Sequence, residues 1–393
     1  MSSFSNTTSG VHNGTRNTWS YIVSVHCPMA ILVDRTLTPL WYVIGLTGNI
    51  ISAKIWSDRR MRKNNSSAVY LAALSISDLV FLLLHSLQEL RYAWLINSLG
   101  VPIVCEGYFL LVLVAQYLSP ALVLGFTVER FIAVCRPFSK EMYCTSSRAL
   151  KVVACLIIVC TSLCSIQSYF WTYNSAYDEC RIRDEVTMGG DTSLWSVWTW
   201  ATEMVIFLVI PLTILAFNVL VIREVRRVTG SELKMAANQA TPVGGRNLFS
   251  GGATTAMLLS VSFYVIVTTL PATLVYVLHP EFPEGDYSLT DREISQDPVW
   301  RRHLIYIMAR KIVEEVCLSH YACNVFLYLV TGAQFRKSFV NLFCRCSNAR
   351  RTHSNDERTV GGTGGGAGTV GVTCAEIVRR ESRQPGQELA AQL

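Results

Sequence analysis

The sequence IVCEGYFLLVLVAQYLSPALVLGFTVERFIAVC, residues 103–135, is apolar for most of its length and carries the adjacent pair Glu129 and Arg130 near its end. A helix needs roughly 18–20 apolar residues to cross a bilayer, so this stretch predicts a membrane-spanning helix. The acid and base beside its end have two interpretations. They form a hydrated helix terminus, or they form a switch that faces another protein.

Further stretches of the same kind lie along the chain, which has 393 residues, 51% of them apolar and only 16% charged. This composition is too apolar for an ordinary soluble protein of that length. Backbone amides in hydrocarbon must bond within their own segment, so helices are expected. The sequence therefore predicts an all-α membrane protein, a bundle of seven helices near residues 36–56, 66–90, 103–135, 148–171, 196–224, 253–279 and 304–331.

Lysine and arginine indicate the orientation of this bundle. They concentrate in alternate connections and beyond the last stretch, for example at Arg60, Arg136, Arg226 and Arg336. Positively charged connections stay in the cytosol, so the N-terminus is expected outside the cell and the C-terminus inside. The net charge of +6 follows from this topology and does not indicate a nucleic-acid partner. We expect a multi-pass protein of the plasma membrane.

The two ends of the chain differ in composition from the bundle at residues 36–331. Residues 1–35 are polar and are expected to form an extracellular N-terminus, with glycosylation acceptors at Asn6 and Asn13. Residues 347–393 are rich in glycine and charge, which is typical of a disordered cytoplasmic tail.

Residues 332–346 connect the bundle to this tail. Their phenylalanines recur every four residues, which predicts a short amphipathic eighth helix on the inner membrane surface. Cys344 and Cys346 at its end are expected sites of palmitoylation. On the outer side, Cys105 and Cys180 can form a disulfide in an oxidising compartment, whereas Cys27 has no evident partner.

Several polar residues fall within the apolar stretches. Asp78 lies in the second and Ser119 in the third, while His320 and Asn324 share one face of the seventh. A charge inside a membrane usually marks a site or a pathway. These residues can enclose a hydrated cation such as sodium, or they can form a polar network that only positions the helices.

A second polar group lies nearer the outside. Arg310 and Glu314 stand one helical turn apart and can pair. Glu89, Glu203 and Glu314 would meet in one cavity of a bundle, and Arg310 can neutralise at most two of them. A surplus of negative charge favours a cationic ligand group. The residues expected to contact a ligand are Gln88, Glu89, Gln116, Glu203, Tyr276, Arg310 and Glu314.

Marker residues of a known family occur in these stretches: Asn49, Asp78, Cys105, Arg130, Pro211, Pro271 and Tyr328. Together with the cassette ERF at 129–131, they resemble the rhodopsin-like, class A family of G-protein-coupled receptors over roughly residues 36–346. The segments LAFNVLVIREVRRV and SFYVIVTTLPATLVYVL are similar to invertebrate neuropeptide receptors of the FMRFamide-like type.

The resemblance implies a receptor that binds an extracellular neuropeptide and passes the signal to a heterotrimeric G protein. Arrestin, kinases and membrane lipids are the further partners that it implies. It implies no enzymatic activity and no cofactor other than a sodium ion as an allosteric modulator.

The resemblance also implies how the switch works. Glu129 and Arg130 are expected to form a latch in the inactive state, and release of Arg130 presents its guanidinium to a partner's helix. The sixth helix is expected to move outward about Pro271. The switch residues are Glu129, Arg130, Pro271, Asn324 and Tyr328.

Two other interpretations stay open from the sequence. A transporter is the main alternative, although the odd number of spans and the lack of an inverted repeat disfavour it. A seven-helix receptor for a non-peptide ligand is the other.

Overall fold

The computed structural model describes residues 19–63, 65–94, 96, 101–175, 179–238 and 248–342. Asn6, Asn13, Cys344, Cys346 and the tail at 347–393 lie outside the described residues. The chain divides into two compact units, Met1–Leu327 and Tyr328–Leu393.

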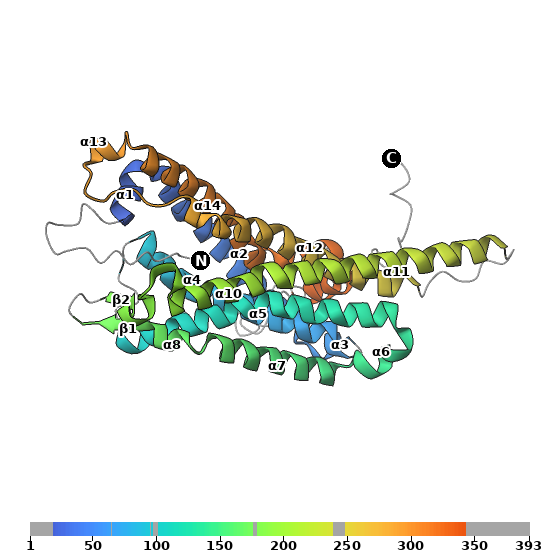
Figure 1. Cartoon of the computed structure of the whole chain (residues 1–393). Coiled ribbons are helices and arrows are strands. Elements are labelled where there is room, and N and C mark those ends of the chain that lie inside the picture. The colour runs from blue at the N-terminus through green and yellow to red at the C-terminus, as the bar shows by residue number, and fades with distance from the viewer. Residues whose placement is uncertain are drawn as a thin grey trace, which may run out of the picture. The chain divides into compact units, whose positions relative to one another are not determined.

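Long helices dominate the first unit, and Figure 1 shows them running alongside one another. Contacts join α2 to α4 and α14, α5 to α4, α7 and α11, and α12 to α11 and α14. The helices are α2 (Pro28–Trp56), α4 (Ser67–Tyr92), α5 (Pro102–Cys135), α7 (Ser146–Cys164), α8 (Gln167–Phe170), α10 (Leu194–Met204), α11 (Ile210–Asn238), α12 (Leu248–Val277), α14 (Pro298–Ala322) and α15 (Asn324–Thr331). Shorter connecting helices are α3 (Arg59–Arg62), α6 (Pro137–Tyr143) and α9 (Asp184–Thr187).

The predicted seven-helix architecture is confirmed, with one helix of unusual composition. Among the described residues, six helices are apolar and long enough to cross a membrane by themselves. The seventh is formed by α14 and α15. It carries the sequence ARKIVEE, whose charged residues line a cavity between the helices, as the next subsection describes.

The fifth span contains a local irregularity. Residues Val205–Val209 form a π-helical turn between α10 and α11. Turns of this kind insert one extra residue into a helix and frequently occur at functional sites. Here the turn begins two residues after Glu203, one of the residues expected to contact a ligand.

The face of the bundle that we expect to lie outside the cell, called the outer face below, carries a β-hairpin that the sequence did not predict. Strand β1 (Trp171–Asn174) pairs antiparallel with β2 (Glu179–Ile182). The predicted disulfide is confirmed: Cys180 in β2 is bonded to Cys105 in α5, with their Cα atoms 5.5 Å apart. The hairpin is thereby attached to the outer end of α5, where the ring of Trp171 stacks on Phe109 at 3.5 Å between centroids.

Helical structure occurs before residue 36, where the first helix was predicted to begin. Helix α1 (Trp19–His26) and the first turns of α2 lie within the region 1–35 that was expected to be a polar extension. Proline at the first position of α2 favours a helix start at Pro28. Ile22 is buried against Ile294 and Trp300 of the outer segment, which comprises η3 (His279–Glu281), α13 (Asp291–Ile294) and the start of α14. Tertiary packing therefore extends the fold outward.

The second unit begins within α15. Residues 333–342 are helical, in agreement with the predicted eighth helix at 332–346 as far as the description reaches. Inside this unit the ring of Phe335 lies 5.3 Å from that of Tyr328. Arg336 donates hydrogen bonds to the carbonyls of Leu329 and Val330, which ties the helix to the end of α15.

Candidate ligand pocket and switch

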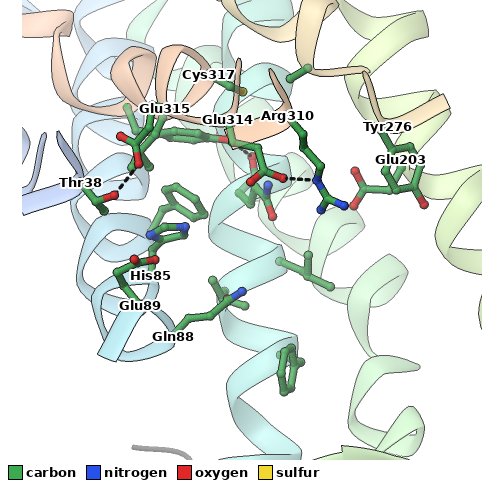
Figure 2. Close-up of a pocket in the computed structure, with 18 of the residues that line it drawn as sticks. Thr38, His85, Gln88, Glu89, Glu203, Tyr276, Arg310, Glu314, Glu315 and Cys317 are labelled. Carbon is green, nitrogen blue, oxygen red and sulfur yellow. Dashed lines mark hydrogen bonds and ion pairs between the residues drawn. The ribbon is translucent and has the colours of Figure 1, made fainter. Parts of the chain in front are cut away.

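A cavity of about 380 Å³ opens among the outer halves of the helices. It is lined by side chains of α1, α2, α4, α5, β1, α10, α12 and α14. All the residues expected to contact a ligand line this cavity, namely Gln88, Glu89, Gln116, Glu203, Tyr276, Arg310 and Glu314. Figure 2 shows most of them pointing toward one another from different helices. The bundle therefore brings together residues that are far apart in sequence.

A chain of ion pairs crosses the cavity. Arg310 Nε lies 2.7 Å from Glu314 Oε1, which is the pair predicted from their spacing. Lys311 Nζ lies 2.8 Å from Asp34 Oδ2 and 3.6 Å from Glu314 Oε2. Neither Lys311 nor Asp34 was among the predicted ligand contacts, and Asp34 lies before the predicted start of the first helix at residue 36. Proline at position 28 was the available signal for an earlier start.

Carboxylates outnumber cations in this cavity. Asp34, Glu89, Glu203, Glu314 and Glu315 line it, against Arg310 and Lys311. The predicted surplus of acid is therefore present in the geometry and is larger than the sequence indicated.

Three of the carboxylates have an oxygen atom without a hydrogen-bond partner among the described residues: Glu89 Oε1, Glu203 Oε2 and Glu315 Oε2. The other oxygen of Glu203 accepts a bond from the Tyr117 hydroxyl at 2.9 Å. The other oxygen of Glu315 accepts one from Thr38. The indole of Trp41 lies beside Glu315, but its N–H makes no hydrogen bond of normal geometry. Buried acceptors of this kind are satisfied when a donor-rich ligand enters.

Aromatic rings form the apolar part of the lining. Phe81 of α4 packs on Tyr321 of α14 with ring centroids 4.1 Å apart. The stacked pair Phe109 and Trp171 lies at the base of the hairpin. Rings in such positions offer large contact area for an apolar or aromatic ligand group.

Helix α1 reaches the cavity from the N-terminal side. Trp19 is a lining residue, and its indole Nε1–H donates to His303 Nε2 of α14 at 3.4 Å. At the other end of α1, His26 Nε2 lies 3.5 Å from Asp291 Oδ1 of α13. No local sequence pattern predicts these contacts, since a helix of this length is stabilised by tertiary packing.

A second polar cluster lies deeper in the bundle. Asp78 accepts hydrogen bonds from Ser119 Oγ and from Asn324 Nδ2, both at 2.8 Å. Among the described residues, Asn324 Oδ1 is buried without a partner. His320 is also buried, and it contacts Cys317 and Tyr321. The structure thus brings together three of the four residues expected around a cation, and places no contact between His320 and those three.

The inner end of α5 shows a different latch from the predicted one. Glu129 and Arg130 form no ion pair with each other, because consecutive residues of a helix point roughly 100° apart. Instead Ser66 donates to Glu129, and Arg130 donates to the Ser67 hydroxyl. The Ser67 Oγ atom also lies 3.5 Å from Glu129 Oε1. The predicted direct latch is corrected to one in which two serines at the start of α4 hold both charges.

Two other residues of the predicted switch, Pro271 and Tyr328, lie on helices other than α5. Pro271 lies inside α12, which continues through it. Near this proline, the Thr273 hydroxyl donates to the carbonyl of Phe207 in the π-helical turn at 2.7 Å. Tyr328 belongs to the second unit and is described above with Phe335.

Comparisons with known proteins agree with this architecture. A family model described as "7 transmembrane receptor (rhodopsin family)" matches residues 48–308. The chain is 24% identical to the FMRFamide receptor of Drosophila melanogaster over 319 residues, which are 77% of this chain and 52% of that receptor. It is 28% identical to the Drosophila melanogaster pyrokinin-1 receptor over 39% of this chain and 37% of that receptor. It is 26% identical to neurotensin receptor type 1 of Homo sapiens over 52% of this chain and 48% of that receptor. The chain thus spans about half the length of the relatives it matches, or less.

Proposed function

Because the chain belongs to the rhodopsin family of seven-transmembrane receptors, we propose that it binds an extracellular neuropeptide and passes the signal to a heterotrimeric G protein. The observation that carries this proposal is the outer cavity, with its surplus of buried carboxylates beside aromatic rings. A basic residue of a peptide supplies the missing donors, and neighbouring apolar residues supply contact with the rings. The names of the relatives support a peptide ligand, since FMRFamide, pyrokinin and neurotensin are peptides.

The signal reaches the inner face through a change in helix arrangement. A ligand shifts this equilibrium only by binding one arrangement more tightly than the other. In the active arrangement, Arg130 leaves the Ser67 hydroxyl and its guanidinium becomes available to a helix of the G protein. The sixth span moves outward about Pro271, and Asn324 and Tyr328 take part in the rearrangement.

A sodium ion fits the inner polar cluster. Asp78, Ser119 and Asn324 would hold it, and the unpartnered Asn324 Oδ1 offers a further oxygen ligand. The ion would supply positive charge to the buried Asp78 carboxylate and stabilise the inactive arrangement as an allosteric modulator. His320 has no described contact with these residues, so we leave it out of the site.

The proposed function includes an orientation in the membrane, two kinds of modification and further partners. The N-terminus is extracellular and glycosylated at Asn6 and Asn13, and the protein resides in the plasma membrane. Palmitoylation at Cys344 and Cys346 fixes the eighth helix to the inner leaflet and its lipids. Kinases and arrestin act on the cytoplasmic tail.

Cells that express the chain provide the test. A panel of amidated and free-acid peptides is applied with calcium and cyclic-nucleotide readouts, and a peptide with a basic residue is expected to give a response that untransfected cells lack. Glu203→Gln and Glu314→Gln are expected to raise the required peptide concentration about tenfold at equal surface expression. Glu185→Gln, on the exposed outer helix α9, is the matched control.

Three outcomes would contradict the proposal. Unchanged potency in both cavity variants would remove the ligand site from this cavity. Uptake of a labelled substrate without any G-protein response would favour a transporter. A response confined to non-peptide compounds would favour the third interpretation.

A further inference from the structure

The two cations of the outer cavity are already engaged. Arg310 pairs with Glu314 at 2.7 Å, and Lys311 pairs with Asp34 at 2.8 Å. These contacts balance Asp34 and Glu314, so the carboxylates left over are those of Glu89, Glu203 and Glu315. Each of the three has one oxygen without a hydrogen-bond partner among the described residues.

The three remaining carboxylates fall into two groups. Figure 2 shows Glu89 and Glu315, with Thr38 and His85, on one side of the Arg310–Glu314 pair, and Glu203 with Tyr276 on the other. We call the first group, Glu89, Glu315 and Thr38, the Glu315 subsite. We call the second group, Glu203, Tyr117 and Tyr276, the Glu203 subsite.

Both subsites are shielded from water. Glu203 is 4% exposed and Glu315 is 6% exposed. Burying a carboxylate without a charged partner costs free energy. A cation that binds in a subsite would offset this cost, so we expect one cation in each subsite. In Figure 2 the Arg310–Glu314 pair lies between the two subsites, so a small cationic group in one subsite does not reach the other.

Another part of the cavity lining is apolar. Phe81, Phe109, Val112, Leu318 and Tyr321 contribute to it. A ligand that reaches both subsites therefore places an apolar or aromatic part against these side chains, where a third charge would be unfavourable.

From this placement we infer that the ligand of the receptor is dicationic: one cationic group binds at Glu89 and Glu315, the other at Glu203, and an apolar or aromatic part joins them. The inference deepens the proposed function and rests on it for the identity of the cavity as the ligand site. A short peptide with a free N-terminal ammonium and one arginine has this chemistry.

The test uses four synthetic probes on the purified full-length receptor in lipid nanodiscs. They are the dipeptide amide Phe-Arg-NH2, its N-acetyl form without the ammonium, its citrulline form without the guanidinium, and the doubly neutral form. Binding is measured by calorimetry or by ligand-observed NMR. The dication is expected to bind about tenfold more tightly than either monocation, and the neutral form least tightly.

Receptor variants assign each charge to a subsite. Glu203→Gln is expected to remove the advantage of one cationic group and leave that of the other, and Glu315→Gln is expected to do the converse. Glu203→Asp keeps the charge and should keep the selectivity, while Glu185→Gln on α9 should bind all probes as the unaltered receptor does. If a glutamine variant does not fold, the probe series on the unaltered receptor still shows whether the receptor recognises two cationic groups of the ligand.

Three results would overturn the inference. The dication binds no more tightly than the monocations, it fails to bind at millimolar concentration, or the variants weaken all charged probes equally. These results are separable from failure of the proposed function. If the receptor binds the dication selectively but activates no G protein, the inference holds and the proposed function is wrong. If peptides with a single cation activate the receptor equally well, the proposed function holds and the inference is wrong.

Discussion

Single residues decide how charge is held at both ends of the bundle. At the inner end, Ser67 lies between Glu129 and Arg130 and contacts both. At the outer end, Lys311 lies between Asp34 and Glu314 and contacts both. Each of these residues contacts two charged neighbours. A mutation of Ser67 or Lys311 therefore removes contacts to both neighbours at once.

Ser67→Ala removes the hydroxyl that accepts the Arg130 hydrogen bond. A bond to a charged group contributes about 1.5–3 kcal/mol, so its loss shifts the balance toward the active arrangement about tenfold or more. We expect higher G-protein turnover without ligand, measured as nucleotide exchange in membranes. Ser146→Ala, which removes an exposed bond to the carbonyl of Arg62, is the control. Unchanged basal turnover in Ser67→Ala would argue against a serine-held latch.

Lys311→Met leaves Asp34 and Glu314 without a shared cation. Breaking a buried ion pair from one side destabilises a protein by about 3–5 kcal/mol, so the thermal unfolding temperature should fall clearly. The double variant Lys311→Met with Asp34→Leu should recover much of the loss, because one unpaired charge is removed and the pair is replaced by apolar packing. If the double variant is less stable than the single one, Asp34 has another role.

At the scale of elements, the spans were predictable and the outer elements were not. Bilayer thickness sets a minimum length for an apolar run, so α5 was located within a residue or two. Helix α1 and the β1–β2 hairpin are short and depend on distant contacts such as Ile22 with Trp300. The local sequence contains no pattern from which such distant contacts can be predicted. The latch at Glu129 and Arg130 differs from the prediction in its partners, because the local sequence does not show that Ser66 and Ser67 of another helix lie beside both charges.

The outer segment that packs against α1 contains a group sensitive to pH. Burial, together with positive charge from Arg310 and His303, lowers the pKa of His279 from 6.5 to about 4, while Glu284 and Glu314 oppose this shift. The unfolded chain therefore takes up a proton first as the pH falls below 6.5. Stability from this residue is complete above that pH and is lost progressively toward pH 4.

His279→Gln should flatten this dependence. The unfolding temperature of the purified receptor is compared at about pH 7 and about pH 5, and the difference is expected to be smaller in the variant. His85→Gln would affect the ligand cavity, so Glu185→Gln on the exposed helix α9 is the control. An equal pH dependence in His279→Gln and the unaltered receptor would contradict the assignment.

Across the whole molecule, three polar clusters succeed one another within the first unit: the outer cavity, the Asp78 cluster and the serine-held latch. Helix α5 supplies a residue to each of them, namely Tyr117, Ser119 and Arg130. The sequence located the clusters because polar residues are rare in apolar spans, but it did not divide the outer acids into paired and unpaired sets. That division depends on which helices are neighbours. A rigid helix shared by all three clusters gives a physical route for coupling between the outer and inner faces.

Sodium offers a test of this coupling that needs no change in the ligand cavity. If the ion binds at Asp78 and stabilises the inactive arrangement, replacing sodium by potassium at equal ionic strength should raise peptide affinity several-fold, because linkage between two sites is reciprocal. Asp78→Asn keeps an acceptor for Ser119 and a group that can pair with Asn324, but it removes the charge that attracts the ion. Peptide affinity in this variant should be the same in both salts. Persistence of the sodium effect in Asp78→Asn would move the ion to another site, and absence of the effect in the unaltered receptor would leave the cluster as a network that only positions helices.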